Sequence, residues 1–289
     1  MEERYINREL ALLAFQERVL DMAADSTMPL LERVKFIAIV TNNLDEFFQV
    51  RVAGLINQQR SSPESRSADG LTAAEQLAAI RPRAERLVRQ IDDIFLDELL
   101  PALEKEQIAF VTWDELHDSE RKALSERFER EMFPVLTPLA VDPTHPFPYI
   151  SNLSLNLAVL VRDRGDKRQR FARVKIPTIL PRFVPLDDGE RFIPIEEVVA
   201  AHLPRLFVGN KIEAHFTFRV TRNADYAIEE DEASDLLEAM ESVLYYRKRS
   251  AAAVRLEVTS GADPVAVDVL TTELGLSEAG VTVHRAPLG

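Results

Sequence analysis

The chain has 289 residues, of which 46% are hydrophobic and 29% charged, and its formal net charge is −13. These values are ordinary for a folded globular protein that buries one large core or two smaller ones. The absence of cysteine excludes disulfides, thiolate nucleophiles and cysteine-based metal sites, and the acidic charge argues against nonspecific binding to nucleic acid or to an anionic membrane.

The N-terminal residues and the apolar stretches predict neither a secretion signal nor a membrane span. The chain begins Met1-Glu2-Glu3-Arg4, and no apolar segment follows these residues. Apolar stretches such as residues 36–40 are far too short to cross a bilayer. We therefore expect a soluble cytoplasmic protein.

Residues 5–105 are predicted to be helical, because apolar side chains recur in them near helical spacing. Ser26 or Thr27 is a plausible N-cap of the second helix, and Pro29 suits a first helical turn. Residues 60–70 are rich in Ser, Pro and Gly, which predicts a polar loop.

The spacing Thr72-x-x-Glu75 predicts a capping box that begins another helix, which runs toward Leu103. Pro82 lies within this helix and is expected to kink it or to delay its start, because proline lacks the amide hydrogen that a helix uses. Residues 1–106 are therefore predicted to form an N-terminal all-α helical bundle.

The pattern changes near residues 105–108, and residues 107–289 are predicted to form an α+β head domain. Alternating apolar and polar side chains predict strands at 153–161, 172–176, 212–220, 254–258 and 281–285. Helical spacing predicts helices at 114–132, 195–207, 231–248 and 264–274. Because the strands fall in separated groups, we expect a mixed or mostly antiparallel sheet.

The sequence lacks the signature of a phosphate-binding loop. Gly275 and Gly280 have the required glycine spacing, but Val281-Thr282 follow where Lys and Ser or Thr are needed. We interpret this segment as a turn after a short helix. The histidines are too far apart in the sequence to form a helical metal-binding pair, and for four of them we favour ordinary surface or structural roles: His117, His202, His215 and His284.

Asn42 and Asn43 are unusual, because asparagine competes with the helix for backbone hydrogen bonds. One interpretation is functional, since an amide offers both a donor and an acceptor and so suits the edge of an adenine base. The other is a polar network inside the bundle or a local break in the helix. The residues alone leave both open.

Blocks of sequence spread over nearly the whole chain resemble the bacterial polyphosphate kinase family. The most recognisable block is Asn-Asn-Leu-Asp-Glu-Phe-Phe-x-Val-Arg at residues 42–51. Further blocks follow the family's order at residues 5–10, 15–20, 29–36, 133–139, 145–148, 152–157 and 219–225.

The resemblance implies an enzyme that reversibly transfers the γ-phosphoryl group of ATP to inorganic polyphosphate, leaving ADP, through a phosphohistidine and with Mg²⁺. It implies that the helical domain contacts adenine through the second asparagine of the block, which is Asn43. It also implies that the head domain takes part in homodimer or higher homo-oligomer contacts. The catalytic histidine and the metal ligands are expected in two C-terminal lobes similar to phospholipase D.

Nothing in these 289 residues corresponds to those lobes, so we expect no catalytic residue and no metal ligand here, and we expect this chain alone to be inactive. The last residues, 286–289, carry neither a helix nor a charged tail, which indicates a chain cut between domains. The alternative is a natural short form that serves as a non-catalytic dimerisation or regulatory module.

Three further segments leave alternatives open. The Pro-rich segment 143–148, which contains His145, is interpreted as a stiff connector rather than a phosphate or subunit contact. Basic residues dominate 162–175, where we favour a solvated hairpin over a polyphosphate contact. Acidic residues dominate 225–241, where we favour a solvated face or a partner surface.

Overall fold

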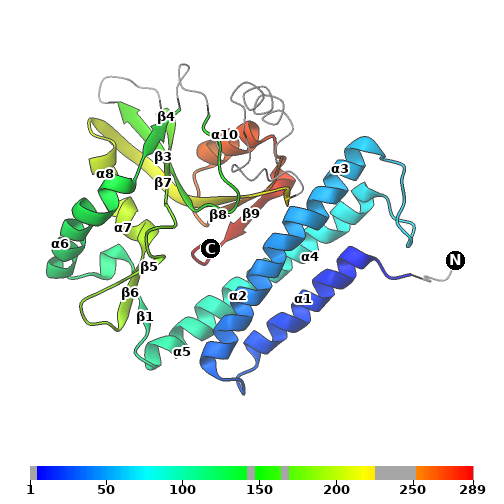
Figure 1. The fold of residues 1–289 in the computed structure, drawn as a ribbon, viewed down its shortest axis with the longest axis horizontal. Coiled ribbons are helices and arrows are strands. Elements are labelled where there is room, and N and C mark those ends of the chain that lie inside the picture. The colour runs from blue at the N-terminus through cyan, green and yellow to red at the C-terminus, as the bar shows by residue number, and fades with distance from the viewer. Residues whose placement is uncertain (1–4, 142–146, 164–168, 225–251, 289) are drawn as a thin grey trace, which may run out of the picture.

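A computed structural model of the protein describes residues 5–141, 147–163, 169–224 and 252–288. A helical part packs against a sheet-containing part (Figure 1). The predicted helix at 231–248, the acidic run at 225–241 and His145 lie outside the described residues.

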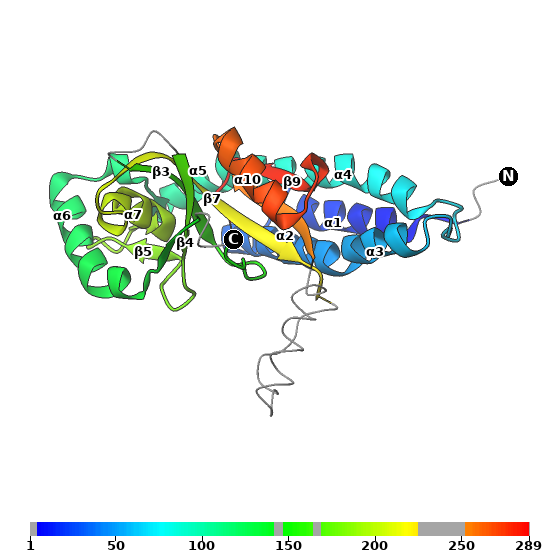
Figure 2. The same cartoon turned by 90° about the horizontal axis from the view of Figure 1, so that it is seen from above.

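The helical part is built from long, continuous helical segments. Its helices are α1 (Arg8–Ala24), α2 (Leu30–Glu46), α3 (Ala53–Ser61), α4 (Ala73–Asp93) and α5 (Leu100–Lys105). A π-helical turn over Phe47–Val52 joins α2 to α3, and another over Ile94–Leu99 joins α4 to α5. Figure 2 shows α1, α2 and α4 extending together away from the sheet. The predicted helical bundle is confirmed.

The predicted start of α4 is confirmed in detail. The Thr72 hydroxyl accepts a hydrogen bond from the Glu75 amide at 3.3 Å, and the Glu75 carboxylate accepts one from the Thr72 amide at 2.7 Å. The helix begins at Ala73 and passes through Pro82, so the expected delay in its start does not occur. Its buried side chains lie on both sides of the proline, and this packing holds the helix together.

The predicted N-cap of α2 is wrong. The cap position is Pro29, which has extended backbone angles, and neither Ser26 nor Thr27 caps the helix. Thr27 instead donates its amide and its hydroxyl to the Asp25 carboxylate at 2.9 and 2.7 Å. The Asp25 side chain closes the preceding turn, so the polar residues there serve the turn rather than the helix.

The head contains two mixed sheets. The larger has the order β2-β4-β3-β7-β8-β9 and is antiparallel except for the parallel pair β8 and β9. The smaller has the order β1-β6-β5. Their strands are β1 (Ala109–Phe110), β2 (Pro138–Ala140), β3 (Asn156–Asp163), β4 (Gln169–Lys175), β5 (Phe183–Pro185), β6 (Arg191–Pro194), β7 (Asn210–Arg222), β8 (Ala253–Thr259) and β9 (Val281–His284). The predicted mixed or mostly antiparallel sheet is confirmed.

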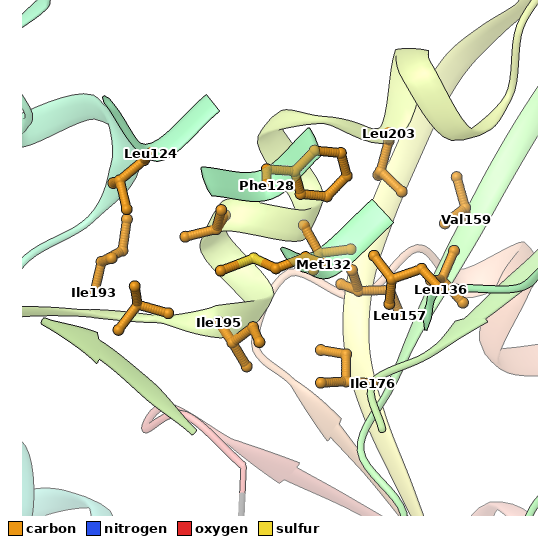
Figure 3. Close-up of a cluster of buried hydrophobic side chains, with 14 of the residues drawn as sticks. Leu124, Phe128, Met132, Leu136, Leu157, Val159, Ile176, Ile193, Ile195 and Leu203 are labelled. Carbon is orange, nitrogen blue, oxygen red and sulfur yellow. The ribbon is translucent and has the colours of Figure 1, made fainter. Parts of the chain in front are cut away.

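The central strand β3 is buried on both faces. Leu157 and Val159 belong to a core shared with the smaller sheet and the helices α6 (Asp118–Arg127), α7 (Ile195–Ala201) and α8 (Leu203–Leu206). Figure 3 shows this core. Ala158 and Leu160 point to the opposite face, which α10 (Pro264–Leu274) covers.

The remaining predicted elements are confirmed only in part. The predicted helix at 114–132 is divided into a 3-10 turn over Trp113–Glu115, then α6, then a π-helical turn over Phe128–Met132. The predicted helix at 195–207 breaks at His202, since Pro204 favours a new first turn there. Gly275 ends α10 with a left-handed φ of 65°, which confirms the predicted turn after a short helix.

No helix among the described residues is both long and apolar enough to cross a membrane.

Candidate functional site

Asn43, the predicted base contact, lies near the C-terminal end of α2 and faces α1. Its side-chain Nδ2 donates a hydrogen bond to Gln16 Oε1 at 3.0 Å. Gln16 is almost completely buried, Asn43 is half-buried and Asn42 is exposed. The two asparagines therefore differ: Asn42 faces solvent, whereas Asn43 makes a polar contact between two helices and keeps part of its amide at the surface.

Asp45 lies on another side of the same helix and is buried against the sheet. Both of its carboxylate oxygens accept hydrogen bonds from Arg219 of β7 at 2.9 Å. One oxygen also accepts from Arg255 of β8 at 2.6 Å. The helix that carries Asn43 is thus tied to two strands of the head domain by charged groups that are shielded from water.

Glu257 completes this arrangement from within the sheet. It lies directly opposite Arg219 on the neighbouring strand and accepts two hydrogen bonds from it, both at 2.9 Å. Arg255 lies 3.1 Å from the same carboxylate and stacks on Phe48 of the π-helical turn, 4.2 Å from the ring centroid. Burial opposes ionisation of Glu257, but Arg255 and Arg219 outweigh it and hold its pKa well below the usual range.

His284 of β9 connects a second helix, α4, to the cluster. Its ring nitrogens lie 3.5 Å from the Asp92 carboxylate of α4 and 3.2 Å from that of Glu257. Burial opposes a charge on the imidazole, but Asp92 and Glu257 outweigh it and raise the pKa of His284 above its ordinary value. We call the connected groups the ion network: Asp45, Asp92, Arg219, Arg255, Glu257 and His284.

The ion network lines a cavity of about 110 Å³ between α2, α4 and the residues after β9. A drug-sized ligand needs several hundred Å³, so this cavity does not fit a nucleotide. A second hollow, about 480 Å³, lies between β8, β9 and α10. Asn43 lines neither hollow. The network therefore fastens the helices to the sheet, and Asn43 lies outside it, on the side of α2 that faces α1.

The described part of the basic segment 162–175 is largely paired. Arg162 lies 2.7 Å from the Glu213 carboxylate, and Arg170 lies 2.8 Å from that of Asp163. Arg173 is buried and donates to the Asn156 side chain at 2.8 Å. The segment does form a hairpin of β3 and β4, but Arg173 does not lie on its exposed face as the sequence suggested.

Among the described residues, no group of three or more His, Asp or Glu side chains could hold a metal ion. His202 is buried, with Nδ1 2.7 Å from the Val198 carbonyl and Nε2 2.9 Å from the Ser125 hydroxyl, and its ring stacks on Phe128. His117 and His215 are exposed.

The sequence prediction missed Gln16 and most of the ion network. The alternation at residues 212–220 and 254–258 predicted strands but did not indicate that their polar face lies against the helices. One signal was present: Asp45 interrupts an apolar helix face, and Arg219, Arg255 and Glu257 occupy alternate positions of two predicted strands. A buried acid on a helix needs a basic partner on whatever packs against it.

Two family models match the chain. The one described as the polyphosphate kinase N-terminal domain matches residues 5–111, and the one described as the polyphosphate kinase middle domain matches residues 119–289. The domain division predicted at residues 106 and 107 stays a prediction.

Curated relatives and a solved structure are similar over nearly the whole chain. A protein named polyphosphate kinase from Mycobacterium marinum is 50% identical over 290 residues, which cover 97% of this chain and 39% of the relative. Its namesake from Mycobacterium tuberculosis is 49% identical, with 96% and 39% covered. The crystal structure of polyphosphate kinase from Porphyromonas gingivalis superposes with a TM-score of 0.77 at 26% identity, and covers 97% of this chain and 39% of that one.

Proposed function

Because the chain belongs to the polyphosphate kinase family, we propose that it forms the base-binding helical part and the head of an ATP–polyphosphate phosphotransferase. That enzyme reversibly moves the γ-phosphoryl group of ATP to inorganic polyphosphate through a phosphohistidine. The chain spans 39% of the length of the relatives named above, so the activity is proposed for a complete enzyme that contains this segment.

The observation that carries the base-binding role is the position of Asn43. The residue is held in place by Gln16, yet its side chain is only half-buried, so a ligand can reach it. An amide presents a donor and an acceptor side by side, which matches the edge of adenine. Asn43 lines neither of the two hollows described above, and the other wall of the base site is proposed to come from the remainder of the complete enzyme.

The ion network supports this role indirectly. It anchors α2 to β7 and β8 two residues after Asn43, and an anchored helix keeps a ligand contact in a fixed position. The head is proposed to contribute homodimer or higher homo-oligomer contacts, and the complete enzyme is proposed to work in the cytoplasm.

Phosphoryl transfer depends on positive charge and metal ions placed around the transferring group. The described residues provide no metal site, because no three of their His, Asp or Glu side chains could hold a metal ion. The arginines of the ion network are paired with carboxylates, so they do not supply positive charge to a phosphate. We therefore assign no step of the transfer to this segment. The phosphorylated histidine and the Mg²⁺ ligands are proposed to lie in the part of the relatives that this chain does not span.

Asn43→Ala in the complete enzyme tests the base-binding role. Loss of the amide is expected to raise the KM for ATP about fivefold, since one hydrogen bond contributes about 1 kcal/mol, while kcat stays the same. Asn42→Ala, which removes the exposed neighbouring amide, is the matched control and is expected to leave KM unchanged. An unchanged KM for Asn43→Ala would contradict the role.

A further inference from the structure

The contact between Asn43 and Gln16 determines which end of the Asn43 amide faces away from α1 in the structure. Asn43 Nδ2 donates to Gln16 Oε1 at 3.0 Å. Among the residues that the structure describes, none donates a hydrogen bond to the Asn43 carbonyl oxygen Oδ1, which is open to solvent. Gln16 is only 3% exposed, so water does not readily replace Asn43 as its partner.

Rotation of the Asn43 amide by half a turn would exchange its oxygen and nitrogen. Oδ1 would then lie about 3.0 Å from Gln16 Oε1, where Nδ2 lies now. Two carbonyl oxygens repel each other at that separation, and both would lose a hydrogen bond in a partly buried place. In the observed pair, Gln16 Oε1 holds the Asn43 nitrogen toward α1 and leaves Oδ1 as the acceptor available to a ligand. The opposite pair requires both amides to turn, so that Gln16 donates to Asn43, and a glutamate at position 16 cannot form it because a carboxylate only accepts.

We infer that Gln16 is a positioning residue for nucleotide selection, which orients Asn43 so that it accepts a hydrogen bond from the 6-amino group of adenine. The inference rests on the proposed base contact of Asn43. Adenine carries a donor at position 6, whereas hypoxanthine and guanine carry a carbonyl oxygen there. A fixed acceptor therefore favours ATP and repels the 6-oxo purine nucleotides.

Inosine triphosphate is the informative probe, because it differs from ATP in the group at position 6 and in the protonation of N1. The complete enzyme is expected to use ATP at least tenfold better than inosine triphosphate, measured as kcat/KM, since one hydrogen bond is at stake. This measurement needs no variant. Equal use of the two nucleotides by the unaltered enzyme would overturn the inference.

Gln16→Met tests the positioning role directly. Methionine fills the same buried space but cannot accept the Asn43 hydrogen bond, so the amide becomes free to rotate. The preference for ATP over inosine triphosphate is expected to fall about tenfold through KM, with kcat unchanged. Gln16→Glu keeps an acceptor oxygen beside Asn43 and is expected to retain the preference.

Gln76→Met is the matched control. Gln76 is also buried in the helical part and also accepts a hydrogen bond from an asparagine amide, that of Asn7 at 3.1 Å. This variant is expected to keep the nucleotide preference. An unchanged preference in folded Gln16→Met, or an equal loss in Gln76→Met, would overturn the inference. If Asn43→Ala raises KM for ATP while Gln16→Met keeps the preference, the base contact stands and the positioning role alone fails.

Discussion

At the scale of single residues, Asp45 and Asn43 make different contacts at the C-terminal end of α2. Asp45 faces the sheet and is bound by Arg219 and Arg255, whereas Asn43 faces α1 and keeps part of its amide at the surface. Because they are two positions apart on a helix, they point in clearly different directions. Asp45 anchors the helix to the sheet, whereas the exposed part of the Asn43 amide is accessible to a ligand.

Asp45→Asn is expected to destabilise the protein by about 3–5 kcal/mol, because it leaves buried arginines without a full counter-charge. Urea denaturation measures the change. Glu85→Gln is the control: its partner is Arg81 on the exposed face of α4, where an ion pair contributes about 0–1 kcal/mol. Similar losses in both variants would show that the ion network is not a special anchor.

His284 makes the stability of the chain depend on pH. It lies directly against Asp92 of α4 and Glu257 of β8. The other charged groups of the ion network come from α2, β7 and β8: Asp45, Arg219 and Arg255. The adjacent Arg285 is paired with Asp93 and Asp97 at the exposed rim. The three carboxylates of the ion network meet two guanidinium groups, so a protonated imidazole balances the charge.

Because the pKa of His284 is raised in the folded state, the folded protein holds this proton more tightly than the unfolded chain does. The resulting stability is fully present below the unfolded pKa of about 6.5 and is lost as pH rises through the folded value. Urea denaturation between pH 6 and 9 is expected to show this loss. His284→Gln should abolish it, whereas exposed His117→Gln should keep it. If the loss of stability with rising pH persists in His284→Gln, other titrating groups cause it.

At this scale, the sequence could predict Asn43 as a candidate but not its partner. Consecutive asparagines within a helix are visible as an anomaly, and the family resemblance adds a role. Gln16 is an ordinary helix residue, and its burial follows only from how α1 packs on α2. The same holds for Asp92 and His284, which are separated by nearly two hundred positions and meet only in the fold.

At the scale of elements, a local signal predicted the start of α4 but not that of α2. The Thr72 capping box is a local chemical pattern, and α4 begins where it predicts. The π-helical turns after α2 and α4 have no comparable pattern. Short strands such as β1, β2, β5 and β6 were missed, because two to four residues give too little alternation to detect.

Thr72→Ala is expected to destabilise the chain by about 1 kcal/mol, because the cap that satisfies the first amides of α4 is lost. Thr72→Ser keeps the hydroxyl and is expected to lose much less. Thermal denaturation of both variants measures the effect. Equal melting temperatures for Ala and Ser would show that packing alone sets the start of this helix.

At the scale of the whole molecule, sequence blocks that are far apart meet where α2 packs on the sheet. Asp45 of the block at 42–51 binds Arg219 of the block at 219–225. Gln49 of the first block accepts a hydrogen bond from Asn152 of the block at 152–157 at 2.8 Å. The alternation of β7 predicted a strand, but which of its faces meets the helices depends on long-range packing that local patterns do not contain.

The proposed role of this segment is to hold the nucleotide for a phosphotransferase without performing the transfer. It supplies an oriented amide on an anchored helix, whereas its described carboxylates and imidazoles form no metal site. In the proposed complete enzyme, the nucleotide base is held by this segment and the phosphates by another.

Mapping of the phosphorylated residue tests whether the transfer takes place outside this segment. The complete enzyme would be incubated with ATP labelled in the γ-phosphate and with Mg²⁺, digested under conditions that preserve phosphohistidine, and its peptides would be analysed by mass spectrometry. We expect the label to lie outside these 289 residues. Label on any of the five histidines of this segment would contradict it.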